Sequence, residues 1–321
     1  MNKVTFGVFL PFYALKTEKN TSPSFSQIRD VVVECEQSGY HSVWLDDHLM
    51  FKQNPILESW TTLSALSSIT TSIRLGTMVT SNAFRNPALL AKMASTVDVI
   101  SKGRLEFGIG AGVQKEEHNA YGFPFPEPPV RIECMKESIE IIMKLWTEEK
   151  ASYKGKHYRI VEAVCEPKPL QKPHPPITIG GNGERHLLKV TAQLADRCDF
   201  GYLPSLEQYK HKLHVLEKYC DSANRNFGKI EKSCWPAGQI IIAKNQKELD
   251  AKVQRRKPKN VSWEDFEKYT LVGTPDVCIE KLQLYLDLGV KHFMLFFGEL
   301  PNTSGLKLFA EAVAKKLEST N

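Results

Sequence analysis

The sequence lacks any apolar run long enough to cross a membrane and any dense block of basic residues. A membrane-spanning helix needs roughly 20 consecutive apolar residues, and no stretch of this chain approaches that length. The start, MNKVTFGVFLPF, has only a short apolar stretch without a small-residue cleavage site, which favours a first strand over a signal peptide. The formal net charge of +5 is spread along the 321 residues. We therefore expect a small-molecule partner, with no membrane and no nucleic-acid partner.

The cysteines form no metal-binding pattern. All seven are scattered, and none belongs to a C-x-x-C pair. An odd set without metal spacing is typical of a reducing compartment, so we expect a cytoplasmic protein. A metal-dependent barrel hydrolase typically carries H-x-H on its first strand, and GVFLPFY contains no histidine. The sequence therefore predicts no metal site.

Several motifs that mark common enzyme classes are also missing. The segment GVFLPF does not form the G-x-G-x-x-G turn of dinucleotide-binding folds, which lowers the expectation of an open Rossmann sheet. The chain contains neither G-x-S-x-G nor G-x-x-x-x-G-K-[ST], so a nucleophile elbow and a P-loop are not expected. A carboxylate pair of the glycosidase kind stays open from the spacing, although no second carboxylate is compelling.

Strand-like apolar runs alternate with helical stripes along the chain. Eight strands are predicted, at residues 4–10, 41–45, 73–79, 104–109, 177–179, 198–203, 235–243 and 292–297. Strands that alternate with helices form parallel sheets through right-handed crossovers. Eight such units in this length predict an α/β fold, a (β/α)8 TIM barrel that forms one domain over residues 1–321. Two interruptions are expected, an insertion at about 148–176 and an excursion at about 244–272.

Charged residues follow the second predicted strand at the point where it ends. In a closed barrel, the C-terminal ends of the strands line the active face. Asp46, Asp47 and His48 occupy such an end, in VWLDDHLMF. The cluster also has explanations without a catalytic role, because aspartate caps helices and histidine donates to backbone carbonyls. A solvated loop is a third explanation.

Glycine-rich segments end the fourth and fifth strands. GGNGER, residues 180–185, follows a strand and precedes a helix, a pattern that favours a phosphate bound to free backbone N–H groups. The same residues also fit a tight strand-to-helix turn. FGIGAGVQ, residues 107–114, places small residues where a flat aromatic ring would need room, and close packing is the alternative. After the third strand, Thr80, Ser81 and Asn82 offer hydrogen-bonding groups, but nothing marks a nucleophile.

Four sequence blocks together resemble the luciferase-like monooxygenase superfamily, and in particular its coenzyme F420-dependent oxidoreductase branch. They are SVWLDDH, IRLGTMVTSNAFRNPALLAKMASTVDVISKGRLEFGIGAG, PPITIGGNGER and VGTPDVCIEKLQLYLDLGVKHF. The resemblance spans the chain from Val4 to about Phe297. It implies a luciferase-like barrel whose mouth holds a flavin or deazaflavin, and it implies a homodimer. It further implies a cis peptide bond at Met78–Val79, behind the ring, and a phosphate-binding loop in GGNGER.

The resemblance also implies which residues form the site. Asp47 and His48 match an Asp-His pair that borders the coenzyme ring, so they are the catalytic candidates and also coenzyme-binding candidates. The other coenzyme-binding candidates come from the ends of strands three, four and five and are Thr77, Met78, Val79, Thr80, Gly110, Ala111, Gly112, Gly180, Gly181, Asn182, Gly183, Glu184 and Arg185.

The chain departs from two groups within the superfamily. Bacterial luciferases carry a Cys-Arg pair where this chain has Gly110 and Ala111, which argues against luciferase-like FMN binding. Sugar-phosphate dehydrogenases of the F420 branch carry a glutamate where this chain has Val113. They also carry a tryptophan shortly after Asp-His, where this chain has Phe51 or no equivalent. The substrate is therefore not assigned by the resemblance.

The leading hypothesis is hydride transfer between coenzyme F420 and a small organic substrate. His48 is the candidate general acid or base, because the unperturbed histidine pKa of about 6.5 lies close to neutral pH. Asp47 would fix the tautomer of His48 or bind the ring system, and Asp46 would have a structural role. Two alternatives stay open, an FMN-dependent monooxygenase that uses reduced FMN and oxygen, and a non-catalytic flavin-binding protein.

Overall fold

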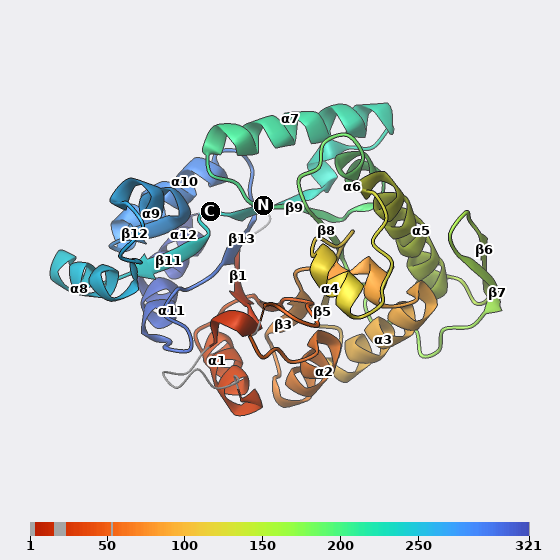
Figure 1. Ribbon diagram of the computed structural model, residues 1–321, viewed down its shortest axis with the longest axis horizontal. Helices are drawn as coiled ribbons and strands as arrows, with labels where there is room; N and C mark the ends of the chain where they lie inside the picture. The colour runs from red at the N-terminus through yellow and green to blue at the C-terminus, as the bar shows by residue number, and fades with distance from the viewer. Residues whose placement is uncertain (1–3, 16–23, 53, 321) are drawn as a thin grey trace.

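The computed structural model describes residues 4–15, 24–52 and 54–320, and its centre is a closed barrel of parallel strands (Figure 1). Around the barrel each strand pairs with the next one, and β1 pairs with both β2 and β13, which closes the sheet. The barrel strands are β1 (Thr5–Leu10), β2 (Ser42–Leu45), β3 (Arg74–Thr77) with its continuation β4 (Thr80–Ser81), β5 (Leu105–Gly110), β8 (Ile177–Gly180), β9 (Arg197–Tyr202), β10 (Glu231–Trp235) and β13 (His292–Leu295). The predicted (β/α)8 barrel is confirmed.

Helices surround the barrel and bury their apolar stripes against it. The α-helices of the described residues are α1 (Phe25–Gln37), α2 (Ser59–Ile69), α3 (Pro87–Ile100), α4 (Lys115–Ala120), α5 (Pro128–Thr147), α6 (Leu187–Leu194), α7 (Leu206–Ser222), α8 (Gln246–Arg256), α9 (Trp263–Tyr269), α10 (Pro275–Leu286), α11 (Ser304–Phe309) and α12 (Lys315–Thr320). Shorter helical turns are η1 (Phe12–Ala14), η2 (Asn82–Phe84), η3 (Phe227–Lys229) and the π-helical η4 (Ala310–Ala314). Within the described ranges, no helix has the length and apolar character that a membrane crossing needs.

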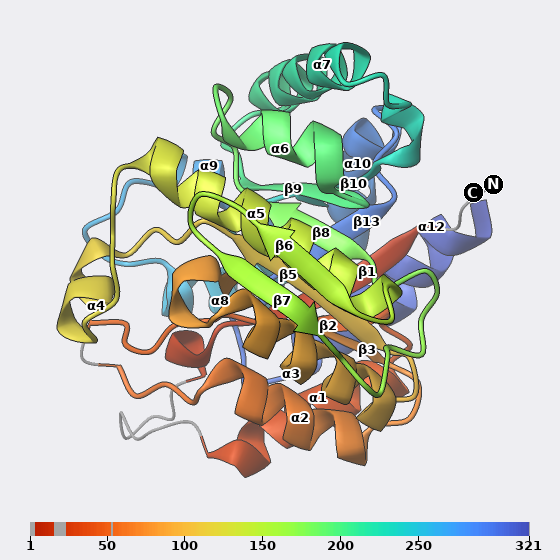
Figure 2. The ribbon, with the colours of Figure 1, turned by 90° about the vertical axis from the view of Figure 1, so that its right-hand side faces the viewer.

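The insertion expected at about 148–176 follows α5 and contains a hairpin. β6 (Ala151–Lys154) and β7 (Arg159–Ala163) pair in antiparallel fashion, and the turn between them includes Gly155. Both views place the hairpin on the outside of the barrel beside α5 (Figures 1 and 2). It therefore extends the outer layer and leaves the mouth of the barrel open.

The sequence predicts the seventh barrel strand at 235–243, and this prediction is wrong. The strand that pairs with β9 and β13 is β10, which ends at Trp235. Two of its side chains make polar contacts with the neighbouring strand, because Ser233 donates to Asp199 and Glu231 pairs with Arg197. Apolar alternation therefore gave no signal for this strand.

The apolar run after β10 forms a separate small unit. β11 (Gln239–Ile242) pairs in parallel with β12 (Thr270–Gly273), and this pair is not part of the barrel sheet. A cluster of its own, Ile241, Ala243, Leu249 and Phe266, joins β11 to α8 and α9. The second interruption, expected at about 244–272, thus packs together with the strand that precedes it, β11.

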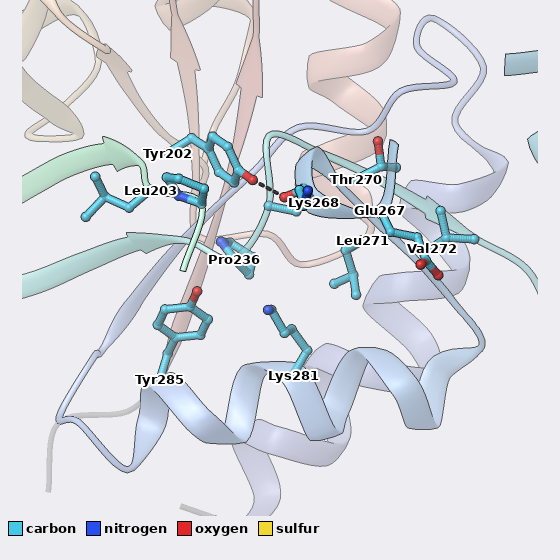
Figure 3. A pocket seen from close by; sticks show the side chains of 12 residues that line it. Tyr202, Leu203, Pro236, Glu267, Lys268, Thr270, Leu271, Val272, Lys281 and Tyr285 are labelled. Atoms are coloured by element: carbon cyan, nitrogen blue, oxygen red, sulfur yellow. Dashed lines mark hydrogen bonds between the residues drawn. The ribbon is translucent and has the colours of Figure 1, made fainter. Parts of the chain in front are cut away.

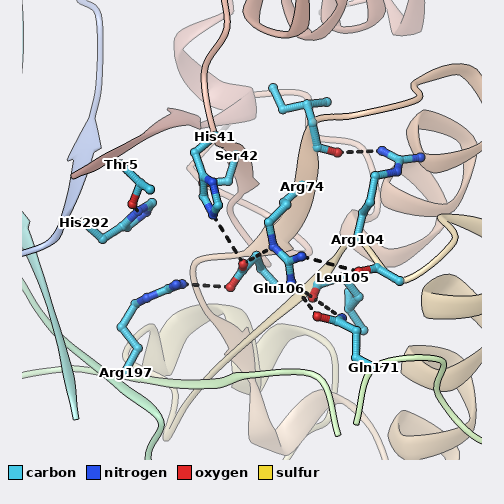
Figure 4. Close-up of polar contacts among 12 residues, drawn as sticks. Thr5, His41, Ser42, Arg74, Arg104, Leu105, Glu106, Gln171, Arg197 and His292 are labelled. Atoms are coloured by element: carbon cyan, nitrogen blue, oxygen red, sulfur yellow. Dashed lines mark hydrogen bonds and ion pairs between the residues drawn. The ribbon is translucent and has the colours of Figure 1, made fainter. Parts of the chain in front are cut away.

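A buried ion-pair cluster lies inside the barrel, towards the N-terminal ends of the strands (Figure 4). Its centre is Glu106 of β5, whose side chain is 1% exposed and whose carboxylate accepts hydrogen bonds from Arg74 of β3 and Arg197 of β9. Burial raises the pKa of Glu106, but the two guanidinium groups outweigh that effect and lower it. The carboxylate therefore stays charged and links three strands of the barrel.

Replacing Glu106 should strongly destabilise the fold. Glu106→Gln removes the carboxylate that Arg74 and the buried Arg197 share, and breaking a buried pair in this way costs about 3–5 kcal/mol. Urea unfolding at neutral pH measures the loss in the free energy of unfolding. Glu280→Gln on α10 is the matched control, because Glu280 is exposed and its replacement should change stability by less than about 0.5 kcal/mol. A loss of less than about 1 kcal/mol for Glu106→Gln would contradict the assigned role.

Candidate active site

A pocket opens at the mouth of the barrel, where β2, β4, β5 and β8 end. Its cavity volume is about 170 Å³, and its lining consists of Asp47, His48, Met78, Val79, Ser81, Gly110, Ala111, Gly112, Val113, Glu117, His118 and Gly180. Figure 2 shows α4, which supplies two of these residues, beyond the strands on the side opposite the chain termini. The structure thus brings together predicted residues from the ends of strands two to five.

The floor of the pocket is built from Val79 and two glycines. β3 ends at Thr77 and the chain resumes as β4, with the predicted cis peptide bond at Met78–Val79 between them. A Cβ added at Gly110 or Gly180 would lie only 2.5 or 2.6 Å from a methyl carbon of Val79. These glycines therefore make room for Val79, and the three residues together form an apolar part of the pocket lining.

The two aspartates of the DDH segment are both engaged by the protein. Asp47 accepts two hydrogen bonds from Arg85, at 2.7 and 2.9 Å, and one from the backbone N–H of Ser81 at 2.9 Å. Asp46 accepts from the backbone N–H of Phe12 at 2.9 Å, and burial raises its pKa to about 6. Asp46 lies outside the pocket lining, as the sequence indicates, and Asp47 anchors β2 to β4 and to Arg85.

His48 is held by Glu117 of α4. Its Nδ1 lies 2.9 Å from Glu117 Oε2, and Oε1 accepts from the backbone N–H groups of Leu49 and Met50. Because a carboxylate only accepts, Nδ1 carries the proton, and Nε2 is left for a ligand. The expectation that Asp47 fixes the tautomer of His48 is therefore wrong, since the carboxylate that does so comes from a different element.

Glu117 also sets the charge of His48. Burial disfavours the charged imidazolium, but the Glu117 carboxylate and the charges of Asp46 and Asp47 outweigh burial and raise the pKa of His48 above its usual value. Burial likewise raises the pKa of Glu117. Its hydrogen bonds outweigh burial and lower the pKa overall, and the bond from His48 has the largest effect among them. The pair is therefore an ion pair of imidazolium and carboxylate in slightly acidic solution.

Two predicted coenzyme contacts lie behind the pocket wall. Thr77 and Thr80 are fully buried, and their hydroxyl oxygens are 2.6 Å apart. Thr77 also bonds to the backbone oxygen of Gly108 at 3.1 Å. These threonines hold β3, β4 and β5 together and do not belong to the lining.

The GGNGER loop lies beside the pocket, and only its first residue, Gly180, contributes to the lining. The helix that follows this loop, α6, begins at Leu187, so Glu184 and Arg185 belong to the loop. Glu184 pairs with Lys212 at 2.6 Å, and Arg185 is exposed. The backbone N–H groups of residues 182–187 have no acceptor among the described residues, and we call these groups the N–H row.

Glu117 and His118 are pocket residues that the sequence reasoning missed. Both come from α4, and His118 is 1% exposed with no hydrogen-bond partner for Nε2 in the described structure. The available signal was KEEH, an acidic pair followed by a histidine, directly after the glycines of the fourth strand. Charged residues on a short helix are usually solvated, and only the fold shows that these two side chains turn inwards.

A second pocket of about the same volume lies away from the DDH segment, between α10, β12 and the ends of β9 and β10 (Figure 3). Its lining is Tyr202, Leu203, Pro204, Pro236, Ala237, Glu267, Lys268, Thr270, Leu271, Val272, Lys281 and Tyr285. The Tyr202 hydroxyl donates to the backbone oxygen of Lys268, and the ammonium of Lys281 points into the space. None of the predicted site residues lines this pocket.

One relative of known sequence resembles the chain over nearly its whole length, and a second resembles less than half of it. An F420-dependent glucose-6-phosphate dehydrogenase from Segniliparus rotundus is 26% identical over 324 residues, which cover 91% of this chain and 94% of the relative. An uncharacterized protein of Mycobacterium tuberculosis is 36% identical over 140 residues, which cover 44% of this chain and 48% of the relative.

Solved structures share the same fold. An F420-dependent secondary alcohol dehydrogenase in complex with an F420-acetone adduct has a TM-score of 0.78 at 20% identity, with 97% of this chain and 98% of that chain covered. The coenzyme F420-dependent tetrahydromethanopterin reductase from Methanopyrus kandleri has a TM-score of 0.80 at 19% identity, with 98% and 99% covered. A long-chain alkane monooxygenase has a TM-score of 0.82 at 15% identity, with 100% and 92% covered.

A family model described as luciferase-like monooxygenase matches residues 4–258. The matched region runs from the first barrel strand to the small unit around β11, and it includes every residue that lines the pocket at the mouth. The chain therefore belongs to the luciferase-like monooxygenase family.

Proposed function

We propose that the protein is an oxidoreductase that transfers a hydride between coenzyme F420 and a small organic substrate. The observation that carries this proposal is the pocket at the mouth, where an apolar floor meets a histidine whose Nε2 has no partner among the described residues. The relative from Segniliparus rotundus, which matches nearly the whole chain and is named for coenzyme F420, supports the choice of coenzyme.

The residues of the pocket fit a flat ring that carries a phosphate. The ring would lie against Val79, whose methyl groups fill the space beside Gly110 and Gly180. The N–H groups of residues 182–187 would hold the phosphate, because unpaired donors before a helix attract anions. The cavity is smaller than the roughly 300–1,000 Å³ of typical ligand pockets, so much of the coenzyme would extend outwards along the loop.

The protein contributes orientation and a proton to this reaction. When bound, the deazaflavin would supply the hydride chemistry. His48 would hold or release a proton at Nε2, because Glu117 fixes the other ring nitrogen and favours the charged form. Asp47 and Arg85 hold the backbone on both sides of the mouth, so that His48 keeps its place beside the floor.

An FMN-dependent monooxygenase is the second candidate. The floor and the row of N–H groups would also accept the ring and phosphate of FMN, and the family includes monooxygenases. Bacterial luciferases carry a Cys-Arg pair at the positions of Gly110 and Ala111. The absence of this pair argues against luciferase-like FMN binding and so favours F420. The two candidates differ in the coenzyme that binds and in whether oxygen is consumed.

Titration of the purified protein separates the two coenzymes. Binding of oxidised F420 should quench the fluorescence until it reaches saturation. FMN should bind at least about tenfold more weakly, a difference of about 1.4 kcal/mol in binding free energy. F420 affinity should fall as salt rises, because the charged tail and phosphate are screened within about 10 Å at 0.1 M. Lys281→Ala in the second pocket is the control and should leave both affinities unchanged. Tighter binding of FMN than of F420 would reject the coenzyme assignment.

Replacing His48 should separate turnover from binding. His48→Ala removes the proton-transferring group, so turnover of a substrate accepted by the wild-type enzyme should fall roughly 10²–10⁴-fold at saturating coenzyme. The affinity for F420, measured by fluorescence, should change much less, because the floor and the N–H row are intact. Unchanged turnover would show that His48 is not the acid or base.

Replacing Glu117 should lower the pKa of His48. The raised pKa means that the ion pair stabilises the protein fully below pH 6.5 and that this stabilisation is lost as pH rises through the folded-state value. Glu117→Gln keeps an acceptor for the loop but removes the charge, so the pKa measured by NMR and the matching inflection of the pH–rate profile should move to lower pH. Glu116→Gln, at an exposed neighbouring position, is the control and should leave both unchanged. An inflection that does not move would contradict the pairing.

A further inference from the structure

His118 presents a buried nitrogen to the pocket. The residue lies on α4 directly after Glu117, and its ring packs between Phe84 and Phe125, with centroid distances of 4.8 and 4.7 Å. Its side chain is almost completely buried, yet Nε2 has no hydrogen-bond partner in the part of the chain that the structure describes. A buried polar atom without a partner is rare, and here it belongs to a residue that lines the pocket.

The other ring nitrogen of His118 fixes what Nε2 can do. Nδ1 lies 2.7 Å from the backbone oxygen of Gln114, and a carbonyl oxygen only accepts, so Nδ1 carries the proton. In the neutral ring, Nε2 is therefore a hydrogen-bond acceptor. The two phenylalanines and this hydrogen bond hold the ring in one orientation, which makes Nε2 a fixed acceptor at the pocket wall.

Ser81 supplies a second unpartnered group at the same place. Its Oγ is buried without a partner, and Ser81 also lines the pocket. A Cβ added at Gly112 would lie 3.0 Å from His118 Nε2 and 3.1 Å from Ser81 Oγ, so both atoms border the space that a side chain would fill. Both atoms therefore lie close to the same backbone position in the pocket wall. A hydroxyl can donate, so the pair offers one acceptor and one donor side by side.

An acceptor beside a donor matches the imide edge of a flavin or deazaflavin ring, where the N3–H donor stands between two carbonyl acceptors. Resting on the proposed function, we propose that His118 Nε2 accepts the hydrogen bond of the coenzyme N3–H and that Ser81 Oγ donates to the adjacent ring carbonyl. His118 is thereby a coenzyme-binding residue that fixes how the ring lies on the floor formed by Val79. His48 remains the group that handles the proton.

The test compares two probes that differ only at N3. The probes are 5-deazaflavin mononucleotide and its N3-methyl derivative, and the measurement is their dissociation constant from fluorescence titration, without turnover. The wild-type protein should bind the N3–H probe at least about tenfold more tightly, because methylation removes the donor and leaves a buried acceptor unpaired. His118→Ala should lose most of this preference. His118→Gln, which keeps an acceptor on a side chain of similar reach, should retain part of it.

Ser81→Ala is the matched control within the same pair. It should weaken both probes by similar factors, because the carbonyl that Ser81 serves is present in each of them. Thermal unfolding midpoints of all variants show that the fold is kept. A preference for the N3–H probe that is the same in His118→Ala as in the wild type would overturn the assignment of His118 while leaving the coenzyme site standing. Failure of the wild-type protein to bind either probe would overturn both this inference and the proposed function.

Discussion

The carboxylate of Glu117 is the contact on which the mouth of the barrel depends. It receives hydrogen bonds from His48 and from two backbone N–H groups of the loop after β2, and so it joins α4 to that loop. The same contact selects the tautomer of His48 and raises its pKa. Because His118 follows Glu117 in the chain, one short helix supplies the carboxylate that orients the first imidazole and carries the second. A change in this helix would therefore alter the surroundings of both histidines together.

The inside of the barrel holds a charged cluster and an apolar cluster at different levels along its axis. Near the N-terminal ends, Glu106 neutralises Arg74 and Arg197 inside the barrel. Towards the mouth, an apolar cluster of Phe9, Trp44 and Met294 fills the interior, and Met78 packs against it beside the pocket.

Much of the fold could be predicted from the sequence because most strands follow apolar alternation or short apolar runs. The exception is instructive, since β10 places Ser233 against Asp199 and Glu231 against Arg197, and polar pairs of this kind leave no apolar period. The neighbouring run that became β11 carries the apolar pattern but packs into a separate unit. Periodicity reports which residues are apolar, and it does not report which sheet buries them.

Part of the candidate site could also be predicted from the sequence. The ends of strands two to five follow from the barrel, and the resemblance placed Asp47, His48 and the glycines there. The partner of His48 could not be found in this way, because Glu117 lies 69 positions further along the chain and the nearer carboxylate, Asp47, is taken by Arg85. For Thr77 and Thr80, only the fold shows that their hydroxyl groups bond to each other behind the wall.

A crystal structure of the protein soaked with oxidised coenzyme F420 tests the central claim most directly. The account predicts that the tricyclic ring lies on Val79 between the glycines, with its phosphate on the N–H groups of residues 182–187 and its imide edge at His118. Coenzyme bound in the second pocket around Lys281, or a mouth without bound coenzyme at a saturating concentration, would contradict the account.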